Sequence, residues 1–193
     1  NRDLYRRADK SFEQAAYETI LSTCRFDVPQ DKFELEQTDM FTIEEMASGP
    51  ITLGLLQWVL NLQGARRVLE IGTFVGVSAM YFAEALPDDG KVVTLEKFDQ
   101  FADIARRNFA RNGLDHKIDL ICGDATDIIP TLAGEKAFDF VFIDGNKERY
   151  AEYMKLVDPL LRPGGVIAVD DAFFHGDALN DTFESEKGQG VRA

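Results

Sequence analysis

The chain has 193 residues, of which 45% are hydrophobic and 28% charged, which is enough apolar material for one domain with a substantial core. Its 21 basic and 34 acidic residues give a formal net charge of -13, which disfavours nucleic acids and anionic membrane surfaces as partners. We expect no membrane span, because no apolar run approaches roughly eighteen residues, and the first residues lack the hydrophobic stretch of a signal peptide.

The two cysteines, Cys24 and Cys122, lack metal-type spacing, and we expect both to be reduced thiols of a soluble cytoplasmic protein. The first residue is not methionine, and residues 188–193 are expected to add no further element, so both ends are expected to be trimmed. We expect residues 1–193 to form a single domain.

The N-terminal third predicts helices. Thr42–Glu45 has the sequence of a capping box, and Ser48–Pro50 either kinks that helix or starts a second one. Four apolar residues then recur at helical spacing, which usually indicates a face packed on the domain: Ile51, Leu55, Trp58 and Leu62. We therefore assign residues 1–62 to a helical cover over one sheet edge, with cofactor contact secondary, and residues 63–193 to the core.

After Gly64, short β-type runs alternate with helical patterns, which predicts an α/β fold with a Rossmann-like, doubly wound and mostly parallel sheet. The apolar runs predict five strands: Arg67–Ile71, Lys91–Leu95, Ile118–Ile121, Phe138–Ile143 and Val166–Val169. Asp99 is expected to cap a helix that stops at Asn112-Gly113. Pro87–Gly90 and Arg162–Gly165 are expected to be turns that bound the second and fifth strands.

The most informative segment is Val68–Ser78, in which an apolar strand runs into a glycine-punctuated turn that opens a helix. Gly72 and Gly76 allow the backbone to approach a ligand, and the helix start offers free N–H donors to an anionic group. Glu96 ends the next strand, where an acid can bind a ribose. The third glycine of the dinucleotide pattern is absent and Glu70 stands just before Gly72, which favours an adenosyl ligand other than NAD.

Acidic residues stand at the carboxyl end of every predicted strand: Glu70, Glu96, Asp124, Asp144, and Asp170 with Asp171. One such acid alone is more often a helix cap or a solvated turn residue, but five strand ends in succession indicate a ligand site. The acids of the first three strands can bind ribose hydroxyls, an amino group and an adenine amine. Those of the last two would repel one another, which predicts a hard divalent cation such as Mg²⁺ or Ca²⁺ among them.

Lys147 follows Asp144 closely and is expected at the same rim. Beside a divalent cation and in a partly dry pocket its pKa is expected to fall, which would make it a candidate base; the alternative is a surface lysine paired with a nearby glutamate. Tyr150 is assigned to packing, and His175 to the rim without a chemical role. No pattern for acyl or phosphoryl transfer is present.

These segments together resemble the class I S-adenosylmethionine-dependent O-methyltransferases, and within them the metal-dependent catechol and caffeoyl-CoA type. Leu69–Ser78 is similar to the first cofactor motif, Val93–Glu96 to the ribose-binding strand end, and Gly123–Ala125 to the adenine contact. Phe138–Tyr150 and Leu160–Asp171 are similar to the metal and base segments.

The resemblance implies a set of cofactor contacts: Glu70, Gly72, Thr73, Gly76, Ser78, Glu96, Asp124, Ala125 and Asp144. Of these, Gly72 and Ser78 would lie against the methionine portion of S-adenosylmethionine, and Glu96 would hold the ribose hydroxyls. Asp124 with Ala125 would meet the adenine.

The resemblance also implies a divalent metal, with Mg²⁺ preferred over Ca²⁺ or Mn²⁺, held by Asp144, Asp170 and Asp171. The metal would chelate two adjacent oxygens of a catechol-like or phenolic small molecule, with Asp144 and Lys147 as catalytic residues and Lys147 taking the proton. Phe173-Phe174 would wall the aromatic ring. Similar enzymes are often homodimers, which we also expect here.

Two departures from the family pattern are visible. Asp170-Asp171 stands where the family usually has Asp-Asn, which adds a negative charge and leaves the metal's identity open. The family also continues into two further strands, which do not follow Ala193 in this sequence. Three alternatives stay open: a tRNA hydroxyuridine O-methyltransferase of the same fold, a catalytically inert S-adenosylmethionine-binding subunit and, more distantly, a nicotinamide oxidoreductase.

Overall fold

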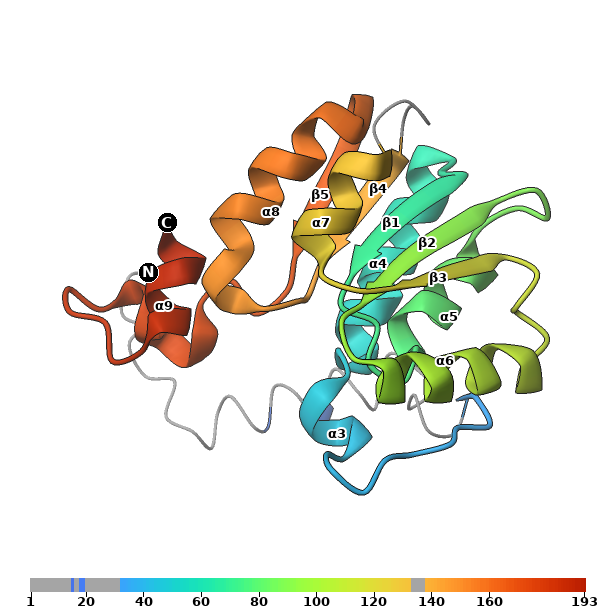
Figure 1. Cartoon of the computed structure of the whole chain (residues 1–193), viewed down its shortest axis with the longest axis horizontal. Helices are drawn as coiled ribbons and strands as arrows, with labels where there is room; N and C mark the ends of the chain where they lie inside the picture. Colours follow the sequence, from blue (N-terminus) through green and yellow to red (C-terminus); the bar gives the residue numbers. More distant parts are fainter. Residues whose placement is uncertain (1–14, 16–17, 20–31, 133–137) are drawn as a thin grey trace.

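Five parallel strands form one sheet in the order β3-β2-β1-β4-β5 (Figure 1). They are β1 (Arg67–Ile71), β2 (Lys91–Glu96), β3 (Ile118–Cys122), β4 (Phe138–Ile143) and β5 (Leu161–Val169). The computed structural model describes residues 15, 18–19, 32–132 and 138–193. Strand order reverses between β1 and β4, which is the point where open α/β sheets bind ligands.

Helices cover both faces of the sheet (Figure 1). On one face lie α4 (Pro50–Gln63), α5 (Val77–Ala85) and α6 (Asp99–Arg111), and on the other α7 (Ala125–Ile128) and α8 (Tyr150–Val157). The shorter elements are α3 (Ile43–Met46), η1 (Ile129–Leu132), η2 (Lys147–Arg149), η3 (Asp158–Leu160), η4 (Phe174–Leu179) and α9 (Glu186–Arg192). Alternate strand residues enter the two cores, for example Val68 on the α5 side and Leu69 on the α8 side. The predicted α/β sheet is therefore confirmed.

The predicted start of the fifth strand was wrong. Arg162–Gly165 is not a turn ahead of β5 but part of it, and the pairing with β4 shifts register there, from Phe138 opposite Leu161 to Phe140 opposite Val166. β5 is the edge strand, so Pro163 interrupts no further ladder. An edge strand can accommodate such a register shift, and the residues predicted as a turn are those at which the shift occurs.

The apolar face predicted to pack in α4 is also wrong. The exposed fractions of Leu55, Trp58 and Leu62 are 55%, 60% and 71%, whereas another stripe, Leu53, Leu56 and Leu60, is buried against the sheet face together with α5. Both stripes have helical spacing, so the period alone could not decide between them. α4 begins as a second helix, with Gly49 as its N-cap, and Thr42 N donates to Glu45 Oε2 at 3.0 Å as the capping box predicts.

The segment predicted to end without an element forms α9. Ser185 Oγ accepts a hydrogen bond from Gly188 N at 3.0 Å and so caps the helix. Gly188 and Gly190 lower the intrinsic helix propensity, which hid this element in the sequence. They also allow close packing, because a Cβ on Gly190 would lie 2.6 Å from the carbonyl oxygen of Lys147.

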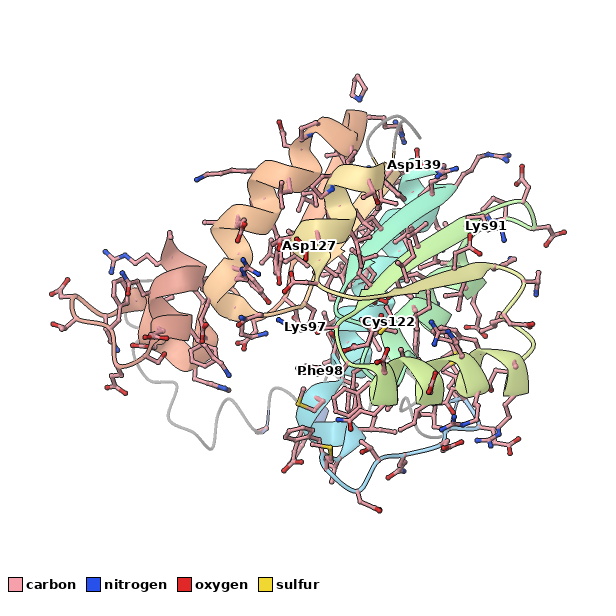
Figure 2. The ribbon with its side chains drawn as sticks, in the orientation of Figure 1. Lys91, Lys97, Phe98, Cys122, Asp127 and Asp139 are labelled. Carbon is pink, nitrogen blue, oxygen red and sulfur yellow. The ribbon has the colours of Figure 1, made fainter. Side chains whose placement is uncertain are left out.

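Cys122 ends β3 and is half-buried. Its Sγ donates to Asp99 Oδ1 at 3.0 Å, and this hydrogen bond, together with burial, raises the pKa of the thiol to about 11. Cys122 therefore stays a neutral thiol, while Cys24 lies outside the described residues. Figure 2 shows Cys122 at the same end of the sheet as Lys97 and Phe98, with Lys91 at the opposite end.

In the parts of the chain that the structure describes, no helix has the length and apolar character needed to cross a bilayer.

Candidate active site

A cavity of about 780 Å³ lies at the carboxyl ends of the strands. Residues that end or follow all five strands line it, and the segment 45–49 ahead of α4 closes one side. Of the strand-end acids, Glu96, Asp124, Asp144, Asp170 and Asp171 line this cavity. The sequence prediction that these junctions meet at one site is thus confirmed for five of the six acids.

The glycine turn (Gly72–Gly76) forms one wall. Gly72 has φ of 100°, its N–H donates to Leu95 O at 2.9 Å, and a Cβ there would lie 2.2 Å from the carbonyl oxygen of Asp144. Gly72, Thr73 and Ser78 line the cavity. Gly76 does not line it; it serves packing, because a Cβ there would lie 2.3 Å from the Phe109 ring.

Glu96 joins the glycine turn to the end of β2. Its side chain is 6% exposed, and it accepts hydrogen bonds from the backbone N–H groups of Thr73 (3.3 Å), Phe74 (2.8 Å) and Phe98 (3.0 Å). A carboxylate held by three amides is fixed in position and still faces the cavity. The structure therefore brings the acid predicted for the ribose next to the predicted cofactor turn.

Glu70, also predicted to contact the cofactor, does not line the cavity. It lies inside β1, is fully buried, and accepts a hydrogen bond from the Thr94 hydroxyl. Burial raises its pKa to about 8; hydrogen bonding by Ser78 and Thr94 opposes the shift, and the charges of Asp144 and Glu96 add to it. Glu70 is therefore a neutral acid behind the glycine turn at neutral pH.

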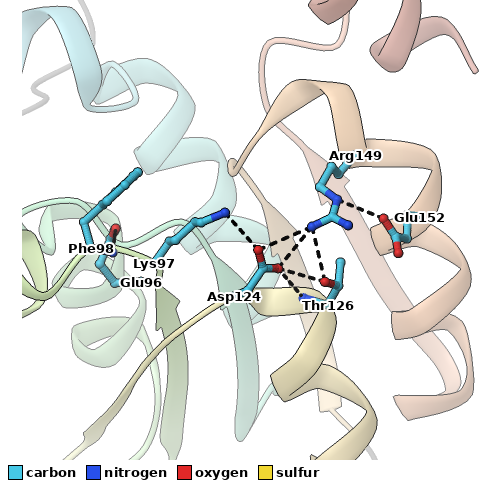
Figure 3. Close-up of polar contacts among 7 residues, drawn as sticks. All are labelled: Glu96, Lys97, Phe98, Asp124, Thr126, Arg149 and Glu152. Atoms are coloured by element: carbon cyan, nitrogen blue, oxygen red, sulfur yellow. Dashed lines mark hydrogen bonds and ion pairs between the residues drawn. The ribbon is translucent and has the colours of Figure 1, made fainter.

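Asp124 is the centre of an ion-pair network (Figure 3). Lys97 Nζ lies 2.9 Å from Asp124 Oδ2, and Arg149 Nη1 lies 3.3 Å from both carboxylate oxygens. Thr126 donates from its N–H (3.1 Å) and its hydroxyl (2.8 Å), so Asp124 also caps α7. The Lys97 hydrogen bond is the main reason that its pKa is lowered to about 2. The helix-cap interpretation thus holds for Asp124, which lines the cavity beside Ala125.

The carboxylate cluster (Asp144, Asp170 and Asp171) follows β4 and β5. Lys147 Nζ lies between two of its members, 3.2 Å from Asp144 Oδ1 and 3.7 Å from Asp171 Oδ2. Burial raises the pKa of Asp144 to about 7; Lys147 opposes this shift, while the charges of Asp170 and Asp171 add to it. The predicted crowding of negative charge is therefore present.

The donor chemistry of the carboxylate cluster fits a hard divalent ion, because three carboxylates share one cavity and the charges of Asp170 and Asp171 help to raise the pKa of Asp144. The carboxylates of Asp144, Asp170 and Asp171 are not, however, close enough together to coordinate one ion as they stand. Within the described residues, no group of three or more His, Cys, Asp or Glu side chains is gathered closely enough to hold a metal ion. The Lys147 ammonium takes up part of that space.

The pKa of Lys147 is raised among its present neighbours, whereas the predicted fall was for a lysine beside a divalent cation. Burial alone would lower it, but the negative charge of Asp144 and the hydrogen bonds to Tyr150 and Asp144 outweigh burial, so the pKa is raised. Here the hydrogen-bond partners of Lys147 Nζ are the Asp144 carboxylate and the Tyr150 hydroxyl. As arranged, Lys147 is a stable ammonium.

Two residues that contact this cluster were not predicted as part of it. The buried Tyr150 hydroxyl accepts from Lys147 Nζ at 3.2 Å and donates to Asp170 O at 3.1 Å, although the sequence assigned Tyr150 to packing. Ser48 Oγ donates to Asp170 Oδ2 at 3.0 Å. The spacing of Tyr150 from Lys147, one helical turn, was an available signal; no local pattern connects Ser48 with Asp170.

The segment after the carboxylate cluster forms the remaining rim. Phe174 and His175 line the cavity, with ring centroids 5.3 Å apart, whereas Phe173 is 64% exposed and does not line it. Only one of the two phenylalanines predicted as walls therefore faces the site. Lys187 of α9, which the sequence did not indicate, also lines the cavity.

The sheet order, the glycine turn and the cavity at the strand ends define a Rossmann-like fold of the class I methyltransferase type. The sequence profile described as O-methyltransferase matches residues 31–192, and the chain belongs to that family.

Curated relatives agree with this assignment. A catechol O-methyltransferase of Niastella koreensis is 37% identical over 139 residues, which cover 71% of this chain and 63% of the relative. A catechol O-methyltransferase of Mycobacterium tuberculosis is 41% identical over 122 residues, which cover 63% of this chain and 55% of the relative. The chain thus spans less than two thirds of the length of either relative.

Solved structures give the same result. An O-methyltransferase from Bacillus cereus in complex with SAH has a TM-score of 0.73 at 36% identity, covering 76% of this chain and 68% of that chain. The O-methyltransferase TomG from Streptomyces achromogenes in complex with SAM has a TM-score of 0.74 at 35% identity, covering 83% and 78%.

Proposed function

We propose that this chain carries the catalytic core of an S-adenosylmethionine-dependent O-methyltransferase that acts on a catechol-like or phenolic small molecule. The observation that carries the proposal is the placement of the Glu96-bound glycine turn and the Lys147-containing carboxylate cluster in one cavity. The names of the two catechol O-methyltransferase relatives and the SAM and SAH complexes of the structural neighbours support it.

The cofactor is assigned to the glycine-turn side of the cavity. Gly72, Thr73 and Ser78 would contact the methionine portion, Glu96 the ribose hydroxyls, and Ala125 the adenine. Asp144 also lines the cavity and would contact the cofactor amino group. Asp124 marks the adenine end, although its oxygens already accept several hydrogen bonds. Glu70 lies behind the glycine turn as a neutral acid, and Gly76, at the end of the turn, packs against Phe109.

A divalent cation, most suitably Mg²⁺, is assigned to Asp144, Asp170 and Asp171. When bound, such an ion lowers the pKa of an acceptor hydroxyl and orients it. Ser48 and Tyr150 hold Asp170 from two directions, by its carboxylate and by its backbone carbonyl. Asp171 contributes a charge where the related enzymes were expected to have a neutral amide.

Lys147 is assigned the removal of the acceptor proton. Its Nζ is held by Asp144 and Tyr150, and it can act as a base only after it has lost its own proton. Neutralisation of Asp144 by another cation would remove the charge that does most to keep Lys147 protonated. The deprotonated acceptor oxygen then attacks the methyl carbon in line, at a distance of about 3 Å, while the methyl–sulfur bond breaks.

The proposal is tested by calorimetry with S-adenosylmethionine, with and without Mg²⁺, followed by a methyl-transfer assay on a panel of catechols. We expect binding of the cofactor, turnover of at least one diol, and loss of turnover with a chelator that added Mg²⁺ reverses. Binding without turnover on any diol would indicate a non-catalytic subunit, and full activity after chelation would contradict the metal assignment.

A further inference from the structure

Within the described part of the chain, one lysine of the cavity, Lys187, has no carboxylate to match its charge. Four Lys or Arg side chains line the cavity: Lys97, Lys147, Arg149 and Lys187. The first three each lie within 3.3 Å of an aspartate oxygen. Among the residues that the structure describes, Lys187 has no ion-pair partner, although acids outnumber bases by 34 to 21 in the whole chain. Its ammonium is therefore open to a ligand in the cavity.

The backbone that carries Lys187 is held firmly against the site. Asp177 accepts hydrogen bonds from Glu184 N (2.7 Å), Ser185 N (3.0 Å) and Ser185 Oγ (2.7 Å), which closes the loop ahead of α9. At the other end of the helix, a Cβ on Gly190 would lie 2.5 Å from Glu148 Cα. α9 is thus packed directly on η2, the element that starts with Lys147, so the backbone of Lys187 lies close to the segment that carries Lys147.

The aromatic ring of Phe174 lies near Lys187 and belongs to the same cavity wall as the carboxylate cluster. Lys187 Nζ lies 5.8 Å from the centroid of the Phe174 ring, and Phe174 follows the carboxylate cluster in the cavity wall. A flat ring whose hydroxyls face the carboxylate cluster and whose face packs on Phe174 would direct a substituent toward Lys187. The ammonium would then meet whatever group stands on the far side of the acceptor ring.

We propose that Lys187 is a specificity-determining residue that selects acceptors with a carboxylate on the ring or on a short side chain. This inference rests on the proposed O-methyltransferase function. The strongly acidic protein would otherwise repel such an acceptor, and the carboxylate cluster would do so most. Lys187 offsets that repulsion at the acceptor's outer end.

The test compares 3,4-dihydroxybenzoate with its neutral methyl ester in the complete chain with S-adenosylmethionine and Mg²⁺. We expect kcat/KM to favour the acid over the ester, mainly through KM, and Lys187→Gln to reduce this acid-to-ester ratio by roughly three- to tenfold. Lys187→Arg should retain most of the ratio. Because the contact is at an accessible rim, about 0.5 M NaCl should also reduce the wild-type ratio.

Lys155→Gln is the matched control, since Lys155 is an exposed lysine of α8 that does not line the cavity, and it should keep the wild-type ratio. An unchanged ratio in Lys187→Gln would overturn the inference. Calorimetry with both compounds on enzyme loaded with S-adenosylhomocysteine and Mg²⁺ separates the two proposals. If no diol is methylated, the proposed O-methyltransferase function fails. The assignment of Lys187 is then judged from binding alone, and it fails if Lys187→Gln leaves the relative affinities for the acid and the ester unchanged.

Discussion

The carbonyl oxygen of Asp144 lies where a side chain on Gly72 would begin. A Cβ on Gly72 would be 2.2 Å from that oxygen, and Asp144 N donates to Ile71 O at 2.9 Å. The turn assigned to the cofactor and the first acid of the carboxylate cluster are therefore held together by backbone contacts. A methyl donor and its acceptor need such a fixed separation, because transfer depends on alignment within about 3 Å.

Gly72→Ala is expected to break this relation. The new Cβ has no room beside Asp144, and φ of 100° is strained for alanine, so we expect a loss of roughly 1 to 3 kcal/mol in unfolding free energy and at least about tenfold weaker S-adenosylmethionine binding. Gly64→Ala is the control: its φ is 60° with nothing within 4 Å, so it should lose stability but keep cofactor affinity. Equal losses of affinity in both variants, measured by calorimetry, would contradict the prediction.

Glu70 should make stability depend on pH. Its folded pKa of about 8 is above its value of 4.5 in the unfolded chain, so the folded state keeps a proton that the unfolded state releases. The stabilisation is fully present below pH 4.5 and is lost as pH rises toward about 8, by at most about 1.4 kcal/mol per pH unit. Glu70→Gln should flatten this decline between about pH 5 and 8 in urea denaturation. An identical slope in the variant would exclude Glu70 as the source.

Lys147→Ala should reduce turnover by about a hundredfold or more while changing S-adenosylmethionine affinity by no more than about twofold. The reason is that Lys147 contacts the carboxylate cluster and Tyr150 rather than the glycine turn. Lys147→Met, which keeps the apolar stem, controls for lost packing. Parallel losses of turnover and cofactor affinity would assign Lys147 a structural role instead.

Tyr150→Phe should reduce kcat by roughly tenfold, because it removes one hydroxyl that both accepts from Lys147 and donates to Asp170 O. Tyr153→Phe provides a comparison on the same helix, since Tyr153 is buried and, among the described residues, it is the Tyr150 hydroxyl rather than that of Tyr153 that hydrogen-bonds Lys147. Steady-state kinetics at saturating cofactor distinguish them. Similar kinetics for both variants would mean that the Tyr150 hydroxyl does not position Lys147.

Asp171→Asn restores the Asp-Asn pair expected from the family resemblance and removes one negative charge from the carboxylate cluster. We expect the Mg²⁺ concentration at half-maximal activity to rise several-fold, because a neutral amide attracts the cation less. The same change should lower the pKa of Asp144, since the Asp171 charge helps to raise it. A Mg²⁺ titration of activity that is identical to the wild type would show that Asp171 does not contribute to cation binding.

The sheet and the ring of strand-end acids could be predicted because both follow from short-range patterns. Apolar runs mark β1 and β4 at their observed bounds, and acids such as Glu96 and Asp144 stand where parallel strands deliver them to one edge. Glu70 does not line the cavity, unlike the other strand-end acids, because it precedes the last residue of β1. In a strand, a one-residue offset turns the side chain to the other face.

The remaining features depend on tertiary contacts that no local pattern encodes. The Ser48 hydroxyl donates a hydrogen bond to Asp170, which is 122 residues away in the sequence. In α4, the buried and the exposed apolar stripes have the same helical spacing. The charge of Lys147 depends on which groups surround it, and its closest neighbours, the Asp144 carboxylate and the Tyr150 hydroxyl, raise its pKa. Gly188 and Gly190 disfavour a helix locally, yet they are what lets α9 pack on η2.

Trp58 is the only tryptophan in the sequence, and it lies 60% exposed on the outer stripe of α4 rather than in the cavity wall. Its indole emission therefore reports on the solvent around that helix. Entry of a nucleoside or a phenol at the strand ends should leave the emission wavelength unchanged, whereas a polypeptide that covers α4 should shift it to the blue. One intrinsic fluorophore thus distinguishes ligand uptake from assembly without any added label.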